Sequence, residues 1–88
     1  MNFFVYMLIS DDIPKIKTYV GYTNNLKKRL KLHNTNKGAK STKGRKWKII
    51  FKKKFTDKSI AMKYEYFLKN NYPLRKVIKL KYLNVKIS

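Results

Sequence analysis

The feature of this sequence that most restricts its fold is an unbroken apolar run close to the start of the chain. Residues Phe3–Ile9 show no polar alternation. A strand with one face in solvent alternates apolar and polar residues, whereas a short run without alternation is typical of a strand buried on both faces. The run therefore predicts the central strand of a sheet.

A second strand is expected to pair with the first. Residues Ser10–Pro14 have the composition of a turn. The β-prone segment Lys17–Tyr22 follows closely enough to pair antiparallel with Phe3–Ile9. Leucines then recur at helical spacing, which predicts a helix from about Asn25 to Asn34 with Thr23 or Asn24 as its N-cap.

One more strand and two helices are expected in the second half of the chain. Residues Trp47–Phe55 alternate well enough for a strand. Asp57 is placed to cap an amphipathic helix from about Lys58 to Asn70, and Pro73 can start a last helix that ends near Leu80. The apolar stripe expected on the first of these helices consists of Ile60, Tyr64, Phe67 and Leu68.

The order of these elements, β-β-α-β-α-α, is typical of a small α+β domain. A length of 88 residues allows one domain, which we expect to span residues 1–88. An apolar content of 43% is too high for a disordered basic tail.

The charge of the chain indicates a polyanionic partner. There are 23 Lys and Arg residues against 4 Asp and Glu residues, for a formal net charge of +19. Nucleic acid is the first candidate and an anionic membrane surface the second, while a general solubility effect or a lysine bias of the genome is the alternative. The excess is mostly lysine.

Several classes of site and location are excluded by composition. The chain has no cysteine, so it cannot hold a disulfide framework, a zinc finger or a thiol nucleophile. Its longest apolar run is far shorter than the roughly 20 residues that cross a bilayer, and no basic segment precedes it as in a signal peptide. We expect an intracellular protein, cytoplasmic or nuclear, with no membrane and no small-molecule cofactor.

The few acidic residues limit the kinds of metal site that the chain can build. Asp11 and Asp12 belong to a turn and Asp57 to a helix cap, which leaves Glu65 in the middle of a helix. Two-metal nucleases need several carboxylates, but Mg²⁺ often takes one or two, with water and substrate phosphate as its other ligands. The alternative is an ordinary ion pair between Glu65 and Lys69 at i,i+4 spacing.

Two basic side chains and two tyrosines are further candidates. Arg29 and His33 are four residues apart on one helix face, where together they can meet a phosphate, or they can be a surface Arg and a packed His. Tyr6 and Tyr19 lie on neighbouring strands, and Gly21 leaves open space beside the Tyr19 ring. The tyrosines either pack in the core or turn their hydroxyls into a site near Arg29.

The segment Asn36–Lys46 is rich in Gly and Lys and is expected to be a mobile basic loop. The spacing of its glycines and its position after a helix do not fit a nucleotide-binding P-loop. We interpret it as a loop that follows the DNA backbone through Lys40, Lys43, Arg45 and Lys46.

Taken together, these residues resemble the GIY-YIG nuclease superfamily, in its small stand-alone branch related to the excision-nuclease catalytic domain. Tyr6 and Tyr19 stand at the tyrosines of the two motif triplets, with twelve residues between them, and Val5 replaces the first glycine. The other matching elements are Gly21–Leu30, His33-Asn34, Gly38–Thr42 and the helical set Ala61, Glu65 and Lys69.

The resemblance implies a three-stranded antiparallel sheet flanked by helices and metal-dependent hydrolysis of a DNA phosphodiester. Its site residues map onto Tyr6, Tyr19, Arg29 and His33 as catalytic residues and Glu65 as the ligand of a single Mg²⁺ or Mn²⁺. A tyrosine hydroxyl, with its pKa lowered by the surrounding positive charge, is expected to deprotonate water, and His33 orients that tyrosine or shares its role.

We therefore expect a small endonuclease for duplex or branched DNA, with a role in repair or recombination. A catalytically inactive GIY-YIG-like module that only binds nucleic acid is the main alternative. A basic RNA-binding protein of the ribosomal kind is a further one, and in it the mid-helix position of Glu65 is a coincidence.

Overall fold

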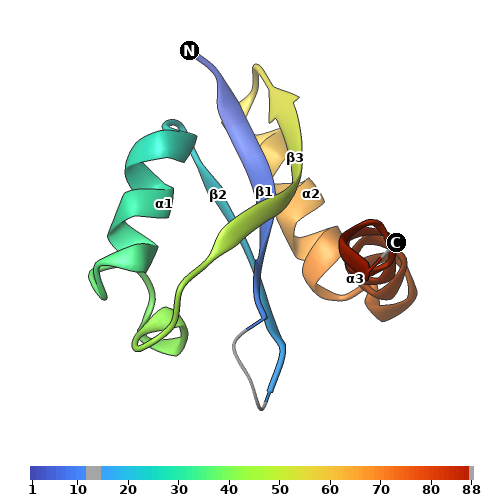
Figure 1. The fold of residues 1–88 in the computed structure, drawn as a ribbon. Coiled ribbons are helices and arrows are strands. Elements are labelled where there is room, and N and C mark those ends of the chain that lie inside the picture. The colour runs from blue at the N-terminus through green and yellow to red at the C-terminus, as the bar shows by residue number, and fades with distance from the viewer. Residues whose placement is uncertain (12–14, 88) are drawn as a thin grey trace.

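A computed structural model describes residues 1–11 and 15–87 of the chain. The turn expected at Ser10–Pro14 therefore lies partly outside the described residues. Three strands and three α-helices follow one another in the expected order (Figure 1). They are β1 (Phe3–Ser10), β2 (Lys17–Thr23), α1 (Leu26–Asn34), the 3₁₀ turn η1 (Lys40–Thr42), β3 (Lys48–Phe55), α2 (Lys58–Lys69) and α3 (Tyr72–Ile87).

The sheet confirms the prediction made from the apolar run. Its strand order is β2-β1-β3, so β1 is central, and both pairings are antiparallel. Every residue from Val5 to Ser10 is buried. In the pairing with β2, Tyr6 lies opposite Gly21 and Leu8 lies opposite Tyr19, so the two tyrosines are diagonal neighbours on one face.

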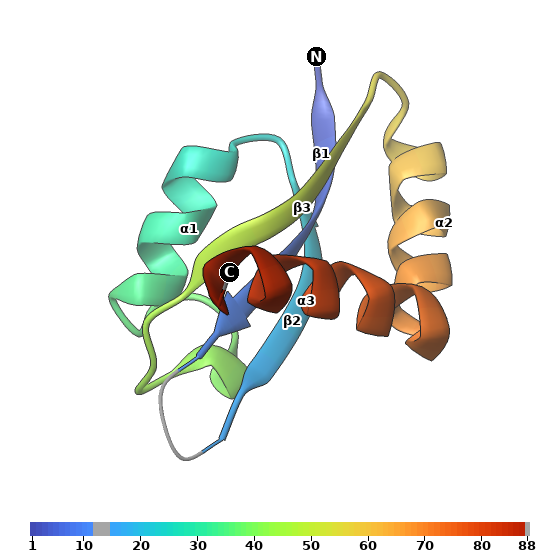
Figure 2. The same cartoon turned by 45° about the vertical axis from the view of Figure 1, so that its right-hand side comes forward.

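Helices cover the two faces of the sheet unequally. Helix α1 lies on one side, whereas α2 and α3 lie on the other (Figures 1 and 2). On the α2 side, Val5 and Met7 pack with Ala61 and Leu68. On the α1 side, the buried residues are Tyr6, Leu8 and Trp47, with Leu26 and Leu30 packed against them. A fold of this α+β class with a three-stranded antiparallel sheet is the one expected from the sequence.

The expected stripe of α2 is wrong in part. Ala61 and Leu68 are fully buried, as their spacing of seven residues allows on one helix face. Ile60 and Phe67 precede them by one residue each, so they are turned away from the sheet and are 53% and 50% exposed. Tyr64 packs against the core as expected.

The ends of two helices also differ from the expectation. Asn25, rather than Thr23 or Asn24, caps α1 by accepting a 3.0 Å hydrogen bond from the Lys28 backbone N–H. Thr23, two residues earlier, instead uses its hydroxyl to bond the backbone N–H and carbonyl of Asn25. Helix α3 continues past Leu80 to Ile87. Its Leu74 and Ile78, both in the part of the helix that the sequence predicts, pack on the sheet core.

Within the described ranges, the helices are all too short or too polar to cross a lipid bilayer.

Candidate functional site

A cavity of about 400 Å³ opens beside the edge strand β2. Four of the five predicted site residues line it: Tyr6, Tyr19, Arg29 and Glu65. They come from four different elements, so it is the tertiary fold that brings them together. The remaining residues of its wall are Phe3, Gly21, Tyr22, Thr23, Asn24 and Lys58.

Gly21 allows Tyr6 to take its place in the wall. A Cβ at this position would lie 2.5 Å from Tyr6 Oη and 2.7 Å from Cζ, closer than real Cβ contacts come. The space beside Gly21 is therefore filled by the end of the Tyr6 ring, and it is not the open space expected beside Tyr19. The centroids of the two tyrosine rings are 6.4 Å apart.

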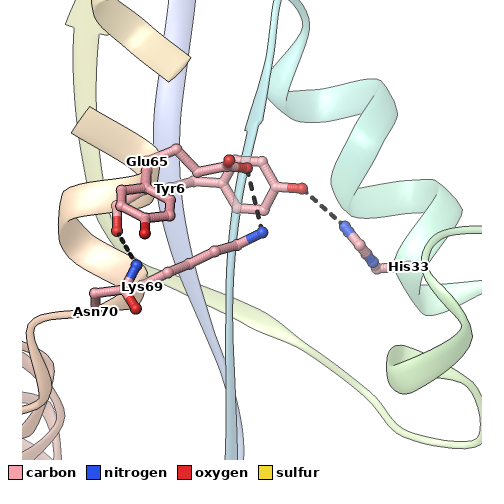
Figure 3. Close-up of polar contacts among 6 residues, drawn as sticks. Tyr6, His33, Glu65, Lys69 and Asn70 are labelled. Atoms are coloured by element: carbon pink, nitrogen blue, oxygen red, sulfur yellow. Dashed lines mark hydrogen bonds and ion pairs between the residues drawn. The ribbon is translucent and has the colours of Figure 1, made fainter. Parts of the chain in front are cut away.

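His33, the fifth predicted residue, lies behind the cavity wall. It has no exposed surface, and its Nε2 is 2.9 Å from Tyr6 Oη (Figure 3). Its Nδ1 is 2.9 Å from Thr42 Oγ1. Of the two alternatives for this pair, the structure shows an exposed Arg29 and a packed His33, and Tyr6 lies between the imidazole and the cavity.

Burial controls the protonation of both hydrogen-bonded rings. Desolvation lowers the pKa of His33, and the charge of Arg29 lowers it further, so the imidazole is neutral near pH 7. Desolvation also raises the pKa of the Tyr6 hydroxyl, an effect that Tyr19 increases and Arg29 opposes. The expected lowering of a tyrosine pKa is therefore wrong for Tyr6, which keeps its proton.

Arg29 is exposed on α1, one turn before His33, and it borders the cavity. Residue spacing explains the arrangement: positions four apart stack on one helix face, and here the later one is buried while the earlier one reaches the rim. The guanidinium thus meets solvent where an anionic group can approach it, with planar donors suited to phosphate oxygens.

Glu65 reaches the same cavity from α2, on the opposite side of the sheet from α1. Its carboxylate Oε2 is 3.7 Å from Lys69 Nζ, which is the i,i+4 pair foreseen from the sequence (Figure 3). Its side chain is 18% exposed, against 48% for Lys69. Glu65 therefore forms the pair foreseen from the sequence and also lines the cavity.

The residues of the cavity fit a hydrated single cation and no larger metal centre. Among the described residues, no three His, Cys, Asp or Glu side chains come together as a metal cage. Glu65 is the carboxylate in the cavity wall, and a Mg²⁺-type ion accepts one carboxylate when water and a phosphate supply its other ligands.

The basic loop lies apart from the cavity. Lys40, Lys43 and Lys46 are exposed, and none of them lines it. Arg45 donates a 3.0 Å hydrogen bond from Nε to Ser10 Oγ and another from Nη2 to the Lys15 carbonyl, so its guanidinium braces the loop against the end of β1. Arg45 thus has a structural role that sequence reasoning missed.

Three further residues hold the site through contacts that the sequence did not indicate. Asn34 clamps the backbone of Trp47, accepting from its N–H at 2.6 Å and donating to its carbonyl at 3.1 Å. Trp47 Nε1 donates to the Thr42 carbonyl at 2.9 Å. A Cβ on Gly38 would lie 2.9 Å from Cγ and Cε1 of His33. The scarcity of glycine is the sequence signal that could have singled out Gly38.

Comparison with known proteins gives a consistent assignment. The sequence profile of the GIY-YIG catalytic domain matches residues 2–77. A UPF0213 protein of Lactiplantibacillus plantarum is 40% identical over 86 residues, which cover 94% of this chain and 79% of that protein. A UPF0213 protein of Oceanobacillus iheyensis is 54% identical over 52 residues, covering 58% of this chain and only 60% of the relative.

A solved structure agrees with the fold. The solution NMR structure of the UPF0213 protein BH0048 from Bacillus halodurans superposes with a TM-score of 0.51 at 37% identity. The match covers 94% of this chain and 85% of that one. The chain therefore belongs to the GIY-YIG family, in its UPF0213 branch.

Proposed function

We propose that this protein is a DNA endonuclease that hydrolyses phosphodiester bonds with one divalent metal ion, and that residues 1–88 act as a single nuclease-like domain. The GIY-YIG domain implies the nuclease superfamily and a nucleic-acid substrate. The observation that carries the proposal is the convergence of Tyr6, Tyr19, Arg29 and Glu65 on one solvent-accessible cavity.

In the proposed reaction, each residue of the cavity has a separate role. Arg29 binds the non-bridging oxygens of the scissile phosphate and stabilises the charge that develops there. Glu65 would hold the metal, Mg²⁺ or Mn²⁺, which when bound supplies Lewis-acid stabilisation of the phosphate and the leaving oxygen.

The proton of the attacking water is proposed to leave through Tyr6. The water oxygen forms a bond to phosphorus while its proton passes to Tyr6 Oη, and the hydroxyl proton of Tyr6 passes to Nε2 of His33. The bond between phosphorus and the leaving oxygen breaks, and that oxygen takes a proton from solvent. Of the two tyrosines, we choose Tyr6 because within the described residues it is the one hydrogen-bonded to His33.

Binding of DNA is proposed to extend beyond the cavity. The exposed loop lysines Lys40, Lys43 and Lys46 would contact backbone phosphates, and Arg45 would contribute mainly by holding the loop. The net charge of +19 suits the chain to binding duplex or branched DNA. We propose that it acts on this DNA inside the cell, in repair or recombination.

The experiment that tests the proposal is incubation of the intact chain with supercoiled, branched and single-stranded DNA. Each reaction contains Mg²⁺, Mn²⁺ or a chelator. We expect nicking that requires the metal. Cleavage that persists in chelator would contradict the one-metal mechanism.

An inactive binding module is the second candidate. The observation in its favour is that Lys69 already neutralises the carboxylate of Glu65, the residue on which metal binding depends. Tight binding of all three DNA forms without cleavage under any metal condition would favour this candidate over the nuclease.

A further inference from the structure

The hydroxyl of Thr42 contacts two groups at hydrogen-bond distance. Thr42 is fully buried in η1, and its Oγ1 lies 2.8 Å from the carbonyl oxygen of Ala39. The same Oγ1 lies 2.9 Å from Nδ1 of His33. These two contacts together determine the direction of the hydrogen bonds in the whole group.

A hydroxyl has one proton to donate, and a carbonyl oxygen can only accept. The 2.8 Å approach of Thr42 Oγ1 to the Ala39 oxygen is favourable only with a proton between the two oxygens, and that proton is the one on Thr42. Thr42 Oγ1 therefore has only lone pairs left for His33. The bond at 2.9 Å must be donated by Nδ1–H of the imidazole.

The assignment at Nδ1 fixes the other nitrogen. A neutral imidazole carries one N–H, so Nε2 of His33 has a lone pair and accepts. The partner of Nε2 is Tyr6 Oη at 2.9 Å, which must then donate its hydroxyl proton. The lone pairs of Tyr6 Oη remain for a proton donor on the cavity side.

We propose that Thr42 is a positioning residue that holds His33 in the Nδ1–H tautomer, so that the Tyr6 hydroxyl points its proton at His33 and its lone pairs at the attacking water. This inference rests on the proposed nuclease function. In the reverse tautomer, Nε2–H would donate to Tyr6 and occupy one lone pair of its oxygen, and His33 could not receive a proton from Tyr6.

The surroundings of Thr42 keep this arrangement in place. Trp47 Nε1 donates to the Thr42 carbonyl, and Asn34 holds the backbone of Trp47 from the end of α1. Gly38 lies directly against the His33 ring, so that a Cβ at this position would collide with it. The backbone of Thr42 and the face of the imidazole are therefore both contacted from outside the pair.

The test uses the fact that His33 is the only histidine of the chain, so that its ring nitrogens can be assigned without ambiguity. Long-range ¹H–¹⁵N correlation spectra of the uniformly ¹⁵N-labelled protein at pH 8 distinguish the two neutral tautomers. We expect the Nδ1–H pattern in the unmodified chain. An Nε2–H pattern there would overturn the proposal without any substitution.

Substitutions at Thr42 then test whether its hydroxyl determines the tautomer of His33. Thr42→Val keeps the shape but removes the acceptor, so we expect the Nε2–H tautomer to appear, whereas Thr42→Ser restores the Nδ1–H pattern. Ser41→Ala, at an exposed neighbour in the same turn, is the matched control. A folded Thr42→Val variant that keeps the Nδ1–H pattern would contradict the positioning role.

Cleavage kinetics provide the second readout. For Thr42→Val we expect kcat to fall by about 10²-fold, the lower end of what a positioned general base contributes, with the KM for DNA unchanged. Thr42→Ser should recover most of the loss. If the parent does not cleave DNA, the proposed function fails, while the spectra still decide the tautomer. Loss in KM alone would contradict the proposal.

Discussion

Tyr6 Oη and His33 Nε2 lie 2.9 Å apart, in a pair separated by 27 positions in the sequence and almost completely removed from solvent. The hydrogen bond joins the central strand to the end of α1, and it links the wall of the cavity to a base that no substrate can reach. An acid or base in such a position acts through its partner. Because Tyr6 makes this hydrogen bond to His33, we expect Tyr6 and Tyr19 to have different roles.

Tyr6→Phe should reduce cleavage much more than Tyr19→Phe. The first substitution removes the hydroxyl that passes a proton to His33, and we expect a fall in kcat of about 10²-fold or more. The second leaves the Tyr6–His33 bond intact. Single-turnover rates of plasmid nicking, with DNA binding measured in parallel, compare the two. An equal loss for both would contradict the assignment of the proton path to Tyr6.

The stability of the protein should fall in mildly acidic solution. The pKa of His33 is lower in the folded chain than its ordinary value of about 6.5, because burial disfavours the imidazolium. The unfolded chain thus binds a proton that the folded chain does not, so the stabilisation is complete above pH 6.5 and is lost as pH falls toward the folded pKa.

Urea midpoints at pH 7.5 and 5.5 check this expectation. The interval spans the ordinary pKa of the chain's single histidine. A midpoint at pH 5.5 equal to or above that at pH 7.5 would show that His33 is not held neutral by the fold.

Gly21→Ala should destabilise the fold through a collision with Tyr6. The new methyl group would lie 2.5 Å from Tyr6 Oη, so ring or strand must shift, at a cost of about 1–3 kcal/mol. In a Tyr6→Ala background the added cost should be much smaller, because the nearest remaining atom is Tyr19 Cε2 at 3.1 Å. Urea unfolding of the four proteins of this cycle measures the coupling. Equal costs in both backgrounds would contradict the close packing.

Substitutions in the basic loop should distinguish the residues that bind DNA from the residue that stabilises the fold. If Lys40 and Lys43 each neutralise one phosphate, Lys40→Ala and Lys43→Ala should each make the slope of log K for duplex binding against log salt concentration shallower by about 0.9. Neither substitution should change the urea midpoint. Arg45→Ala should instead lower the free energy of unfolding by about 1–3 kcal/mol, since it removes the hydrogen bonds from the guanidinium to Ser10 Oγ and the Lys15 carbonyl. Fluorescence anisotropy at several salt concentrations measures binding. The reverse pattern would mean that Arg45 is the DNA contact.

Local pattern was sufficient to predict much of the fold. The run Phe3–Ile9 identified the central strand. Consecutive residues of a strand face opposite sides of the sheet, so a strand that is buried on both sides is apolar at every position. Asp57 was recognised as a cap because the interaction spans three residues, and its carboxylate accepts from Ile60 N–H at 3.0 Å. Helix α3 was predicted too short, because it ends at Ile87 and not near Leu80.

The candidate site, like the fold, could be predicted from the sequence only in part. Tyr6, Tyr19, Arg29 and Glu65 were found through their resemblance to a motif, and the fold brings them to one cavity. Thr42 was not assigned a role, because its contact with His33 depends on the path of the loop between α1 and β3. The raised pKa of Tyr6 was also missed. The net positive charge of the chain favours a phenolate and so predicts a lower pKa, but the burial of the hydroxyl, which depends on the tertiary fold, has the larger effect and raises it.

The central claim is that the cavity beside β2 is a nuclease site in which Glu65 and Arg29 act on a phosphate. The most direct measurement compares metal-dependent nicking of supercoiled DNA by the parent, Glu65→Gln and Arg29→Ala, with Lys28→Ala as a control at an exposed α1 position outside the cavity. The account predicts that Glu65→Gln and Arg29→Ala lose nicking by at least about 10²-fold while they still bind DNA, and that Lys28→Ala cuts like the parent. Cleavage at the parental rate by both Glu65→Gln and Arg29→Ala would contradict it.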